Sequence, residues 1–526
     1  MVLAQDSLVE YGSRRVIITL TAIICTLLEI IDTTIVNVAL NDMRGNLGAT
    51  LTEVAWVITA YAIGNVIIIP MTSWLSIQFG RRNYFAASIM IFTVCSFLCG
   101  NANGIWELVL FRFLQGLGGG ALLATSQTII TEVYPPEKRS MAQAIYGLGV
   151  IVGPTLGPPL GGYIVENYSW PYIFYINIPI GVIATLLTLQ FIRNPNYGTK
   201  SAGRDIDWLG IALLAASVGS LQYVLEKGQD DDWFSNIFII IFTCTAFLGA
   251  FFFIWWELTF RNPIVNLRVL KNGNLRIGTG LTFLLGFGLY GSTFIIPVYT
   301  QSTLGWTAFQ SGMLMVPAAI TTAFLMPIVG KVLSKGVPQQ FLVSMGMLFF
   351  AVFCFWGYFI LTNSTPEQNF FWMLVTRGVG LPLLFIPITS LSLSTLKGAE
   401  IGQGVAFTGM MRQVGGSFGV ALITTFMARQ NMFHRSTLVS KLSIDDPVVL
   451  GRLHALQGGF IAKGMQPDLA LKSAYKALDY VVSSQANVLS YMDVFYYLGL
   501  IFLICIPFVL FVKRNKQKLD LSEAMH

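Results

Sequence analysis

Two acidic residues, Glu29 and Asp32, lie inside an apolar run that extends from Val16 to Leu40. A charged side chain at the centre of a membrane span costs about 2.5–3.5 kcal/mol even on lenient insertion scales. The two residues are three positions apart, so a helix places both carboxyl groups on one face. Structural packing alone is a poor reason for two titratable acids at this depth. The spacing therefore predicts a proton-handling site.

Arg112 is the basic residue expected to pair with Asp32. It lies about five residues, or ~8 Å, from the start of the apolar run 107–131. Asp32 lies about eight residues, or ~12 Å, from the end of its own run at the same membrane surface, and the two side chains can bridge the difference. Arg377 and Arg412 are the other charged residues deep inside apolar runs. Purely structural pairing is the alternative, above all for Arg377.

Apolar runs long enough to cross a bilayer recur along the 526 residues. Only 11% of the residues are charged, where a soluble chain carries roughly 25%, and the mean hydropathy is +0.67. The sequence therefore predicts an all-α polytopic membrane protein with fourteen transmembrane helices. The spans are expected at 16–40, 53–76, 84–100, 107–131, 141–165, 170–192, 206–226, 235–258, 275–300, 309–333, 340–361, 370–395, 402–428 and 491–512.

Residue types that support other chemistry are few and poorly placed. All six cysteines lie inside apolar runs, which argues against a disulfide framework and against a Cys/His zinc site. His434 and His454 lie twenty positions apart with no cysteine nearby, so no metal and no cofactor are expected. The glycines at 116–120 lie inside a span and serve helix packing instead of nucleotide binding. Without a nucleophile–base set, the chain is not expected to be an enzyme.

Basic residues alternate between the loops and predict the orientation. Arg14 and Arg15 precede the first span, and the loops after the even-numbered spans carry most of the other loop Lys and Arg residues. The opposite short loops contain Arg44 and Lys227 and little else, and one holds the acidic run 230–232. The positive-inside rule therefore places both termini in the cytoplasm.

One long segment, residues 429–490, interrupts the pattern of short loops. It is expected on the external side and contains helix-like stretches near 446–460 and 467–488. Long external segments cross the membrane regardless of charge, so its Lys and Arg residues do not contradict the topology. Two interpretations are open: a soluble cap over the outer face, and a docking surface for an external partner.

A weak internal repeat divides the chain into two similar halves. LVLFRFLQGLGGG (108–120) is similar to MLVTRGVGLPLL (373–384), and Arg112 and Arg377 occupy matching positions. Paired halves with a site near the midplane are typical of transporters that work by alternating access. The predicted domains are a six-helix bundle at 1–192, two inserted linker spans at 193–258, and a second six-helix bundle at 259–526 that includes the external segment 429–490.

The stretch GVIVGPTLGPPLGG (149–162) combines a glycine repeat with prolines. Glycine at every fourth position gives one smooth helical face where another backbone can approach closely. Prolines kink the helix and remove amide donors, which is tolerated where neighbouring helices surround it. This face predicts a helix that seals and slides against a partner, with tight packing without motion as the alternative. Its residues are Gly149, Gly153, Pro154, Gly157 and Gly161, with Pro158 and Pro159 beside them.

These motifs resemble the fourteen-span drug:proton antiporter branch of the major facilitator superfamily, and within it the EmrB-like efflux subunits, over nearly the whole chain. Three of them resemble the branch motifs of the first, fourth and fifth spans: LEIIDTTIVNVAL (28–40), RFLQG (112–116) and GVIVGPTLGPPLGG (149–162). Three more stretches resemble signatures of the branch, and the first two are quite specific: FYINIPIG (174–181), RDIDWLG (204–210) and WELTFRNPIVNL (256–267).

One loop departs from the family pattern. SWLSIQFGRR (73–82) resembles the family's gating loop, but Ser73 replaces its glycine and Ile77 its aspartate. The charge relay attributed to that loop is therefore not implied here. The residues that match, and that the resemblance assigns to gating, are Leu75, Gly80, Arg81 and Arg82.

The resemblance implies proton-coupled multidrug efflux: export of hydrophobic or amphipathic toxic compounds across a Gram-negative bacterial inner membrane, hence antibiotic resistance. It makes Asp32 the coupling carboxylate and Arg112 the residue that tunes it. The position of Glu29, one turn nearer the cytoplasm, predicts a second acid that adjusts the site or contacts cationic substrates. The partners it implies are lipophilic small molecules, protons, the lipid bilayer, an EmrA-like periplasmic adaptor and a TolC-like outer-membrane channel, with no nucleic acid. The polar residues expected around the substrate cavity are Asn37, Gln115, Tyr146, Tyr290 and Arg412.

Two other functions are open from the sequence. A dedicated exporter of one endogenous metabolite, such as a siderophore or a fatty acid, would use the same fold, and a substrate survey separates the two. A non-transporting membrane receptor is the alternative from a different class. No stretch of the sequence resembles a signalling domain, which argues against the receptor.

Overall fold

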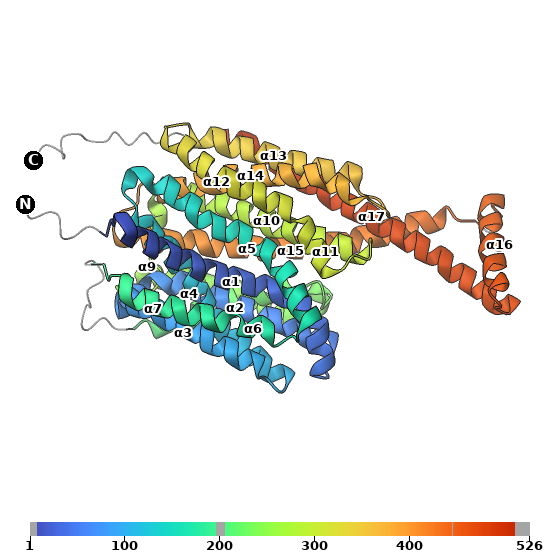
Figure 1. Ribbon diagram of the computed structural model, residues 1–526, viewed down its shortest axis with the longest axis horizontal. Coiled ribbons are helices and arrows are strands. Elements are labelled where there is room, and N and C mark those ends of the chain that lie inside the picture. Colours follow the sequence, from blue (N-terminus) through green and yellow to red (C-terminus); the bar gives the residue numbers. More distant parts are fainter. Residues whose placement is uncertain (1–7, 196–205, 444, 511–526) are drawn as a thin grey trace, which may run out of the picture.

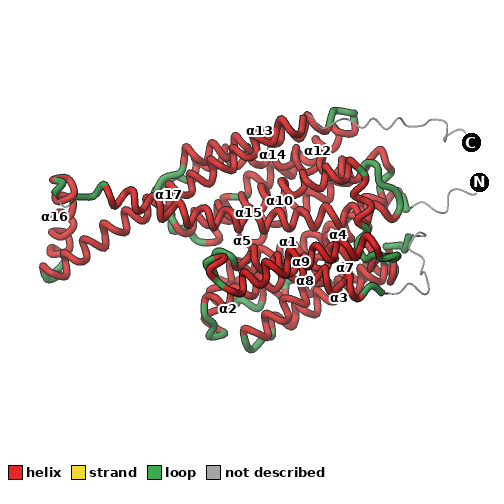
Figure 2. The backbone as a smooth tube through the Cα atoms, turned by 180° about the vertical axis from the view of Figure 1, so that it is seen from behind, coloured by secondary structure: helices red, strands yellow, loops and turns green. Residues whose placement is uncertain are grey.

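The computed structural model describes residues 8–195, 206–443 and 445–510. Within these ranges the chain forms helices and connecting loops, with no strand (Figure 2). Thirteen helical segments are long and apolar enough to cross a membrane, and they correspond to thirteen of the fourteen predicted spans. Predictions that rest on Arg204, or on residues before Leu8 and after Leu510, lie outside the described residues.

The first half of the chain supplies six spans, whose helix ends follow from local sequence. Thr50 and Glu53 form a capping box at the start of α2, and Gly80, with φ of +80°, joins α2 to α3 in a conformation that favours glycine. The predicted span 170–192 is two helices, broken at Ile176. The elements are α1 (Gly12–Asn46), α2 (Leu51–Phe79), α3 (Arg81–Gly100), α4 (Ile105–Val133), α5 (Arg139–Asn167), α6 (Tyr172–Tyr175) and α7 (Asn177–Phe191).

Two inserted helices follow, α8 (Trp208–Lys227) and α9 (Ile237–Thr259). Helix α8 packs against α2 of the first half and also against α15 of the second half, and α9 packs against α8. Phe247 and Phe251 of α9 are 71% and 65% exposed. Large apolar side chains turned outward are what a lipid-facing helix requires, so α9 lies on the periphery of the bundle.

The second half supplies the remaining spans. Its helix α15 contains the predicted span 402–428 but is not among the thirteen apolar segments, because glycines and polar residues lower its hydropathy. These glycines allow close packing on α10: a Cβ at Gly415 would lie 2.9 Å from the carbonyl carbon of Phe283. The elements are α10 (Gly273–Ser302), α11 (Ala308–Leu314), α12 (Val316–Ser334), α13 (Gln339–Ile360), α14 (Glu367–Leu393), α15 (Ala399–Ser440), α16 (Pro447–Ala462) and α17 (Pro467–Leu510).

The helices of the two halves pack in corresponding pairs. In the first half α1 contacts α5, α3 contacts α4, and α3 contacts α7; in the second half α10 contacts α15, α13 contacts α14, and α13 contacts α17. The predicted internal repeat is therefore visible in the packing. Arg112 on α4 and Arg377 on α14 occupy the fourth helix of each half.

Helices α15 and α17 continue beyond the bundle and, with α16, form a protrusion made of residues 429–490 (Figure 1). Arg435 on α15 pairs with Asp479 on α17 at 2.7 Å, which ties the two helices together there. The stretch 446–460 is α16 as predicted, but 467–488 is not a separate helix, because no glycine or proline separates it from the following span. The protrusion points away from the bundle, and both interpretations of this segment, a cap over the outer face and a docking surface, stay predictions.

The two ends of the bundle differ in the segments that lie there. Helix α1 begins and α17 ends at one end, called the terminal end, and the protrusion extends from the opposite end, called the protrusion end (Figure 1). An even number of crossings requires this arrangement. Residues along α1 therefore run from the terminal end at Gly12 toward the protrusion end at Asn46.

Candidate functional site

The Asp32–Arg112 ion pair lies at the centre of the first half. The Arg112 guanidinium on α4 donates a hydrogen bond to Oδ2 of Asp32 on α1 at 2.6 Å. Asp32 is fully buried and Arg112 is 1% exposed. The pairing that the sequence predicted from depth alone is present. An ion pair this deeply buried needs further hydrogen bonds to satisfy its remaining polar atoms.

Three neutral side chains complete the cluster. The amides of Asn177 and Gln115 donate to Oδ1 of Asp32 at 2.8 and 3.1 Å, and both also donate to Ser96 Oγ. Because Arg112, Asn177 and Gln115 all donate to Asp32, the arrangement fits an ionised carboxylate. Sequence reasoning did not assign Asn177 or Ser96 a role. The FYINIPIG motif, which contains Asn177, was the sequence feature that could have identified it, and the structure places this residue at the start of α7.

The Arg112 guanidinium lies between the Asp32 cluster and open space. It stacks on the Tyr61 ring at 4.1 Å from the centroid, and its Nε donates to the carbonyl of Val57 at 3.4 Å. Arg112 and Tyr61 both line a cavity, whereas Asp32 does not. Asp32 is therefore separated from the cavity by the arginine that neutralises it.

The central cavity, of about 570 Å³, lies between the two halves. Its lining on α1 runs from Thr33 to Leu40, so it occupies the part of the bundle toward the protrusion end. Apolar, aromatic and small polar side chains alternate around it, as in sites for drug-sized ligands. The helices that line it are α1, α2, α4 and α5 of the first half, the inserted α8, and α10, α11 and α15 of the second half.

The structure divides the residues expected around the cavity into two groups. Asn37 and Tyr290 line the central cavity, on opposite halves. Gln115 belongs to the Asp32 cluster instead. Tyr146 and Arg412 lie buried between the halves, where Arg412 donates to the Tyr146 hydroxyl at 3.3 Å. Sequence position gave depth along each helix but not which side of the helix faces the cavity.

Glu29 lies one turn from Asp32 toward the terminal end and is 4% exposed. Its Oε1 accepts a hydrogen bond from the amide of Asn65 at 2.8 Å, and its Oε2 has no partner among the described residues. Arg412, on the opposite half, likewise has one nitrogen, Nη1, without a partner among the described residues.

The glycine face of α5 packs on α1, the helix that carries both acids. A Cβ at Gly153 would lie 2.7 Å from Ile30 Cγ2, and one at Gly157 would lie 2.8 Å from Thr34 Cβ. Gly149 and Gly161 approach the same helix. The partner helix that the glycine repeat predicted is therefore α1, which belongs to the same half as α5. Other residues of α5, Pro154 and Pro158 among them, line the central cavity.

Contacts between the halves close the bundle on the terminal side of the cavity. The hydroxyls of Ser140 on α5 and Ser390 on α14 lie 3.2 Å apart. A Cβ at Gly330 of α12 would lie 3.1 Å from Cβ of Ala144 on α5. On the other side of the bundle a Cβ at Gly402 would lie 3.0 Å from Ser73 Oγ, next to the predicted gating loop.

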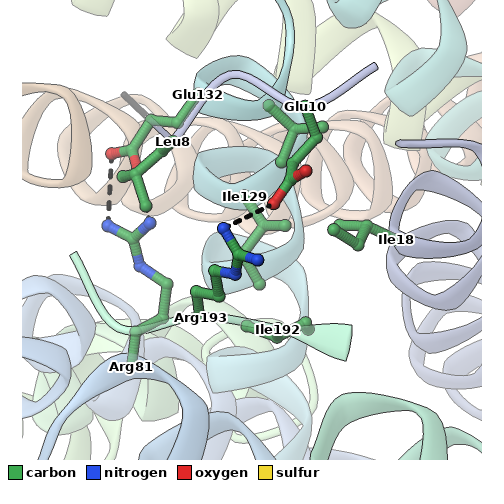
Figure 3. A pocket seen from close by; sticks show the side chains of 9 residues that line it. Leu8, Glu10, Ile18, Arg81, Ile129, Glu132, Ile192 and Arg193 are labelled. Atoms are coloured by element: carbon green, nitrogen blue, oxygen red, sulfur yellow. Dashed lines mark hydrogen bonds and ion pairs between the residues drawn. The ribbon is translucent and has the colours of Figure 1, made fainter. Parts of the chain in front are cut away.

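The gating loop itself is anchored by ionic contacts at the terminal end. Arg81 forms a buried ion pair with Glu132 of α4, a residue that sequence reasoning had not assigned (Figure 3). Beside it Arg193 pairs with Glu10 at 3.4 Å. The backbone N–H of Arg82 donates to the Asn194 side chain at 2.9 Å. The loop is thus tied to α4 and to the end of α7, and Gly80 supplies the turn.

The two remaining signature motifs meet at the terminal end of the inserted helices. Asp207 caps α8 by accepting the N–H of Gly210 at 2.7 Å, and it also accepts from the Trp256 indole at 2.8 Å. The neighbouring Glu257 is 1% exposed and accepts from the N–H of Val265 at 3.4 Å. These residues fasten α8, α9 and the following connection to one another.

Comparison with known proteins identifies the architecture. Residues 22–420 match the Major Facilitator Superfamily. The chain belongs to this superfamily. Its structure is similar to the proton:xylose symporter XylE, with a TM-score of 0.58 and 14% identity over 94% of this chain and 96% of that chain. It is also similar to the human organic anion transporter MFSD10, with a TM-score of 0.55 and 13% identity over 94% and 100% of the two chains. Identity this low supports the fold alone.

Relatives within the superfamily are closer in sequence. The chain is 34% identical to the multidrug export protein EmrB of Escherichia coli strain K12, over 95% of this chain and 96% of that protein. It is 31% identical to the fatty acid resistance protein FarB of Neisseria gonorrhoeae, over 95% and 97% of the two chains. This major facilitator is therefore a multi-pass membrane transporter of the EmrB-like multidrug type.

Proposed function

We propose that this chain is a proton-coupled antiporter that exports hydrophobic or amphipathic toxic compounds by alternating access. One observation carries the proposal: the buried Asp32–Arg112 pair adjoins the central cavity, with Arg112 on the cavity wall. A proton-accepting group is thus linked to a drug-sized cavity by a single side chain. The similarity to proteins named for multidrug export supports the same activity.

The ion pair supplies a physical route to exchange. An ionised Asp32 offsets the positive charge of Arg112, so the cavity wall is neutral at that point. A proton on Asp32 removes this compensation and leaves a positive charge facing the cavity. That charge repels a cationic substrate and favours its release. Proton and cation then exclude each other, which an exchange cycle requires.

The orientation and the moving parts follow from the same proposal. With the terminal end in the cytoplasm, the central cavity lies toward the outer face, and the Ser140–Ser390 contact lies on the cytoplasmic side. The six-helix units 1–192 and 259–526 then rock against each other to expose the site inward. The α1–α5 glycine seam would transmit a change at Asp32 to α5, which also contacts α11, α12 and α14 of the second half.

Transport in proteoliposomes tests the proposal. Purified protein is reconstituted with an imposed pH gradient and given matched lipophilic cations, anions and neutral compounds. The expected result is accumulation of several unrelated compounds, driven by the gradient and abolished by a protonophore. Accumulation that is indifferent to the pH gradient would contradict proton coupling. Transport of a single compound would contradict a multidrug role.

Export of fatty acids is the second candidate function, and the similarity to FarB favours it. Arg112 on the cavity wall is the side chain that would face a carboxylate headgroup. The same panel decides between the two functions. A preference for long-chain fatty acids over every lipophilic cation would select this candidate.

The protrusion is the proposed docking site for an adaptor protein in the periplasm. It extends from the bundle, and its helix α16 contacts α17 but no other helix closely. Deletion of residues 443–466, with α15 joined to α17, removes this tip and leaves the bundle intact. Transport in proteoliposomes should persist while drug resistance of whole cells is lost. Equal loss in both assays would mean that the protrusion is only structural.

A further inference from the structure

The inserted helices contribute a charged residue to the central cavity. Glu226 lies in the last turn of α8 and lines the cavity, although the other lining residues all belong to the two six-helix halves or to the short connection after α11. Helix α8 reaches the cavity because it packs between α2 and α15. The Tyr223 ring stacks on Trp56 of α2 at 5.6 Å, which fixes this end of α8 against the first half.

Glu226 is held in place by a buried amide. Nε2 of Gln222 donates to Glu226 Oε1 at 3.0 Å and to Ser417 Oγ on α15 at 2.8 Å. Gln222 is 1% exposed, so this bridge is protected from water. Ser417 also lines the cavity. The carboxylate of Glu226 is therefore positioned on the wall by hydrogen bonds that join the inserted unit to the second half.

Glu226 is the acidic residue of the cavity wall that has no cationic partner among the described residues. Arg112 and Glu226 are the only formally charged residues that line the described cavity, and Arg112 is neutralised by Asp32. No Lys, Arg or His nitrogen of the described residues lies within ion-pair distance of Glu226, and the adjacent Lys227 pairs with Asp230 at 3.5 Å. The wall therefore presents a carboxyl group without a cationic partner among aromatic side chains such as Tyr290 and Phe294.

We propose that Glu226 is a substrate-selecting carboxylate, supplied by the inserted helices, that binds the charged group of amphipathic organic cations. The inference rests on the proposed export function and adds a site that the two six-helix halves do not contain. A lipophilic cation would place its charge at Glu226 and its apolar groups against the aromatic wall. Selection by charge at Glu226 is then separate from proton exchange at Asp32.

Binding of two ions of the same size and opposite charge tests this inference. Tetraphenylphosphonium and tetraphenylborate are titrated against detergent-solubilised protein. Glu226→Gln should weaken binding of tetraphenylphosphonium by about tenfold, which is roughly 1.4 kcal/mol, and should leave or improve binding of tetraphenylborate. The introduced amide still accepts the Gln222 hydrogen bond, so the fold is preserved. Glu226→Asp keeps the charge and should restore much of the cation affinity.

A matched control and the proton signal separate the possible failures. Glu166→Gln makes the same change in charge at an exposed position near the protrusion end of α5, outside the cavity lining, and should change neither affinity. Proton release on tetraphenylphosphonium binding should persist in Glu226→Gln at saturating cation. Unchanged cation affinity in Glu226→Gln, with normal binding by wild type, overturns this inference alone. Wild type that binds neither ion overturns this inference together with the proposed export function.

Discussion

The two halves of this transporter hold the same buried arginine in different surroundings. In the first half Arg112 on α4 reaches Asp32 on α1. In the second half Arg377 on α14 reaches the corresponding helix, α10, and donates to the hydroxyls of Ser292 at 2.9 Å and Thr293 at 2.6 Å. Both arginines are nearly inaccessible. No carboxylate of the described residues pairs with Arg377.

This difference separates a structural role from a chemical one. An arginine that joins the fourth helix to the first occurs in both halves, so the contact itself belongs to the fold. A carboxylate is a titratable group that can accept a proton, whereas a serine or threonine hydroxyl is not. Proton coupling is therefore expected in the first half alone. The alternative considered for Arg377 from sequence, a structural ion pair, does not apply, because its partners are hydroxyls.

The largest expected effect comes from removing the proton-accepting group. Asp32→Asn should still insert and bind an uncharged drug but should lose proton-driven transport to the level of empty liposomes, because an amide binds no proton in this pH range. The matched change in the second half, Ser292→Ala, should keep transport. Drug-induced proton release from solubilised protein is the measurement. Wild-type proton release by Asp32→Asn would move the coupling site elsewhere.

The next comparison is between two contacts in which glycines let helices pack closely, α5 on α1 in the first half and α15 on α10 in the second half. Leucine at Gly157 would push α5 away from α1, the helix that carries Asp32. Leucine at Gly419 would push α15 away from α10, because a Cβ at Gly419 would already lie 2.9 Å from the Phe287 carbonyl oxygen. We expect Gly157→Leu to abolish drug-induced proton release, and Gly419→Leu to slow transport while proton release persists. Gly45→Leu, at an exposed site with no neighbour within 4 Å, is the control. Identical behaviour of Gly157→Leu and Gly419→Leu would contradict the expectation that only the α1–α5 contact affects proton release.

Replacing the arginines should affect stability unequally. Arg112→Gln leaves the carboxylate of Asp32 buried without its counter-charge, and loss of one partner from a buried pair costs about 3–5 kcal/mol. Arg377→Gln leaves only neutral hydroxyls and should destabilise far less. Thermal unfolding in detergent compares the two variants, and proton release should survive in Arg377→Gln. Equal losses of stability would mean that the two sites are equivalent.

The smallest effect is expected at Glu29. Glu29→Gln retains an acceptor for the Asn65 hydrogen bond and leaves the Asp32 cluster intact. We expect proton-driven transport within roughly threefold of wild type, a difference of about 0.7 kcal/mol, with an altered range of substrates. Transport of a cation panel by wild type and variant is the measurement. Loss of coupling in Glu29→Gln would make both acids obligatory.

Most of the architecture was predictable because hydropathy acts along the chain. A span must bury its backbone hydrogen bonds and expose apolar side chains, so its length and position can be read from sequence. The span 402–428 was predictable although α15 is less apolar than the rest. The continuity of α17 was missed, because a polar stretch followed by an apolar one looks the same whether the helix breaks or continues.

The candidate site was only half accessible from sequence. Asp32 and Arg112 were identified by their charge in apolar runs, since the cost of burying a charge marks such residues. The same criterion does not identify three other residues. Asn177 and Ser96 are neutral, and Glu226 lies at the end of its span. Their roles depend on which helices meet.

The sequence by itself determined the membrane-spanning helices and the buried charges, because both follow from the energy of placing a residue in a bilayer. It also determined the two-fold repeat, because similar motifs occur in the two halves. Only the tertiary structure decided which charges meet and which face the cavity. Helix packing brings α1, α4 and α7 together around Asp32, and α2, α8 and α15 around Glu226. Those contacts depend on the rotation of each helix about its axis, which hydropathy leaves undetermined when most faces of a span are apolar.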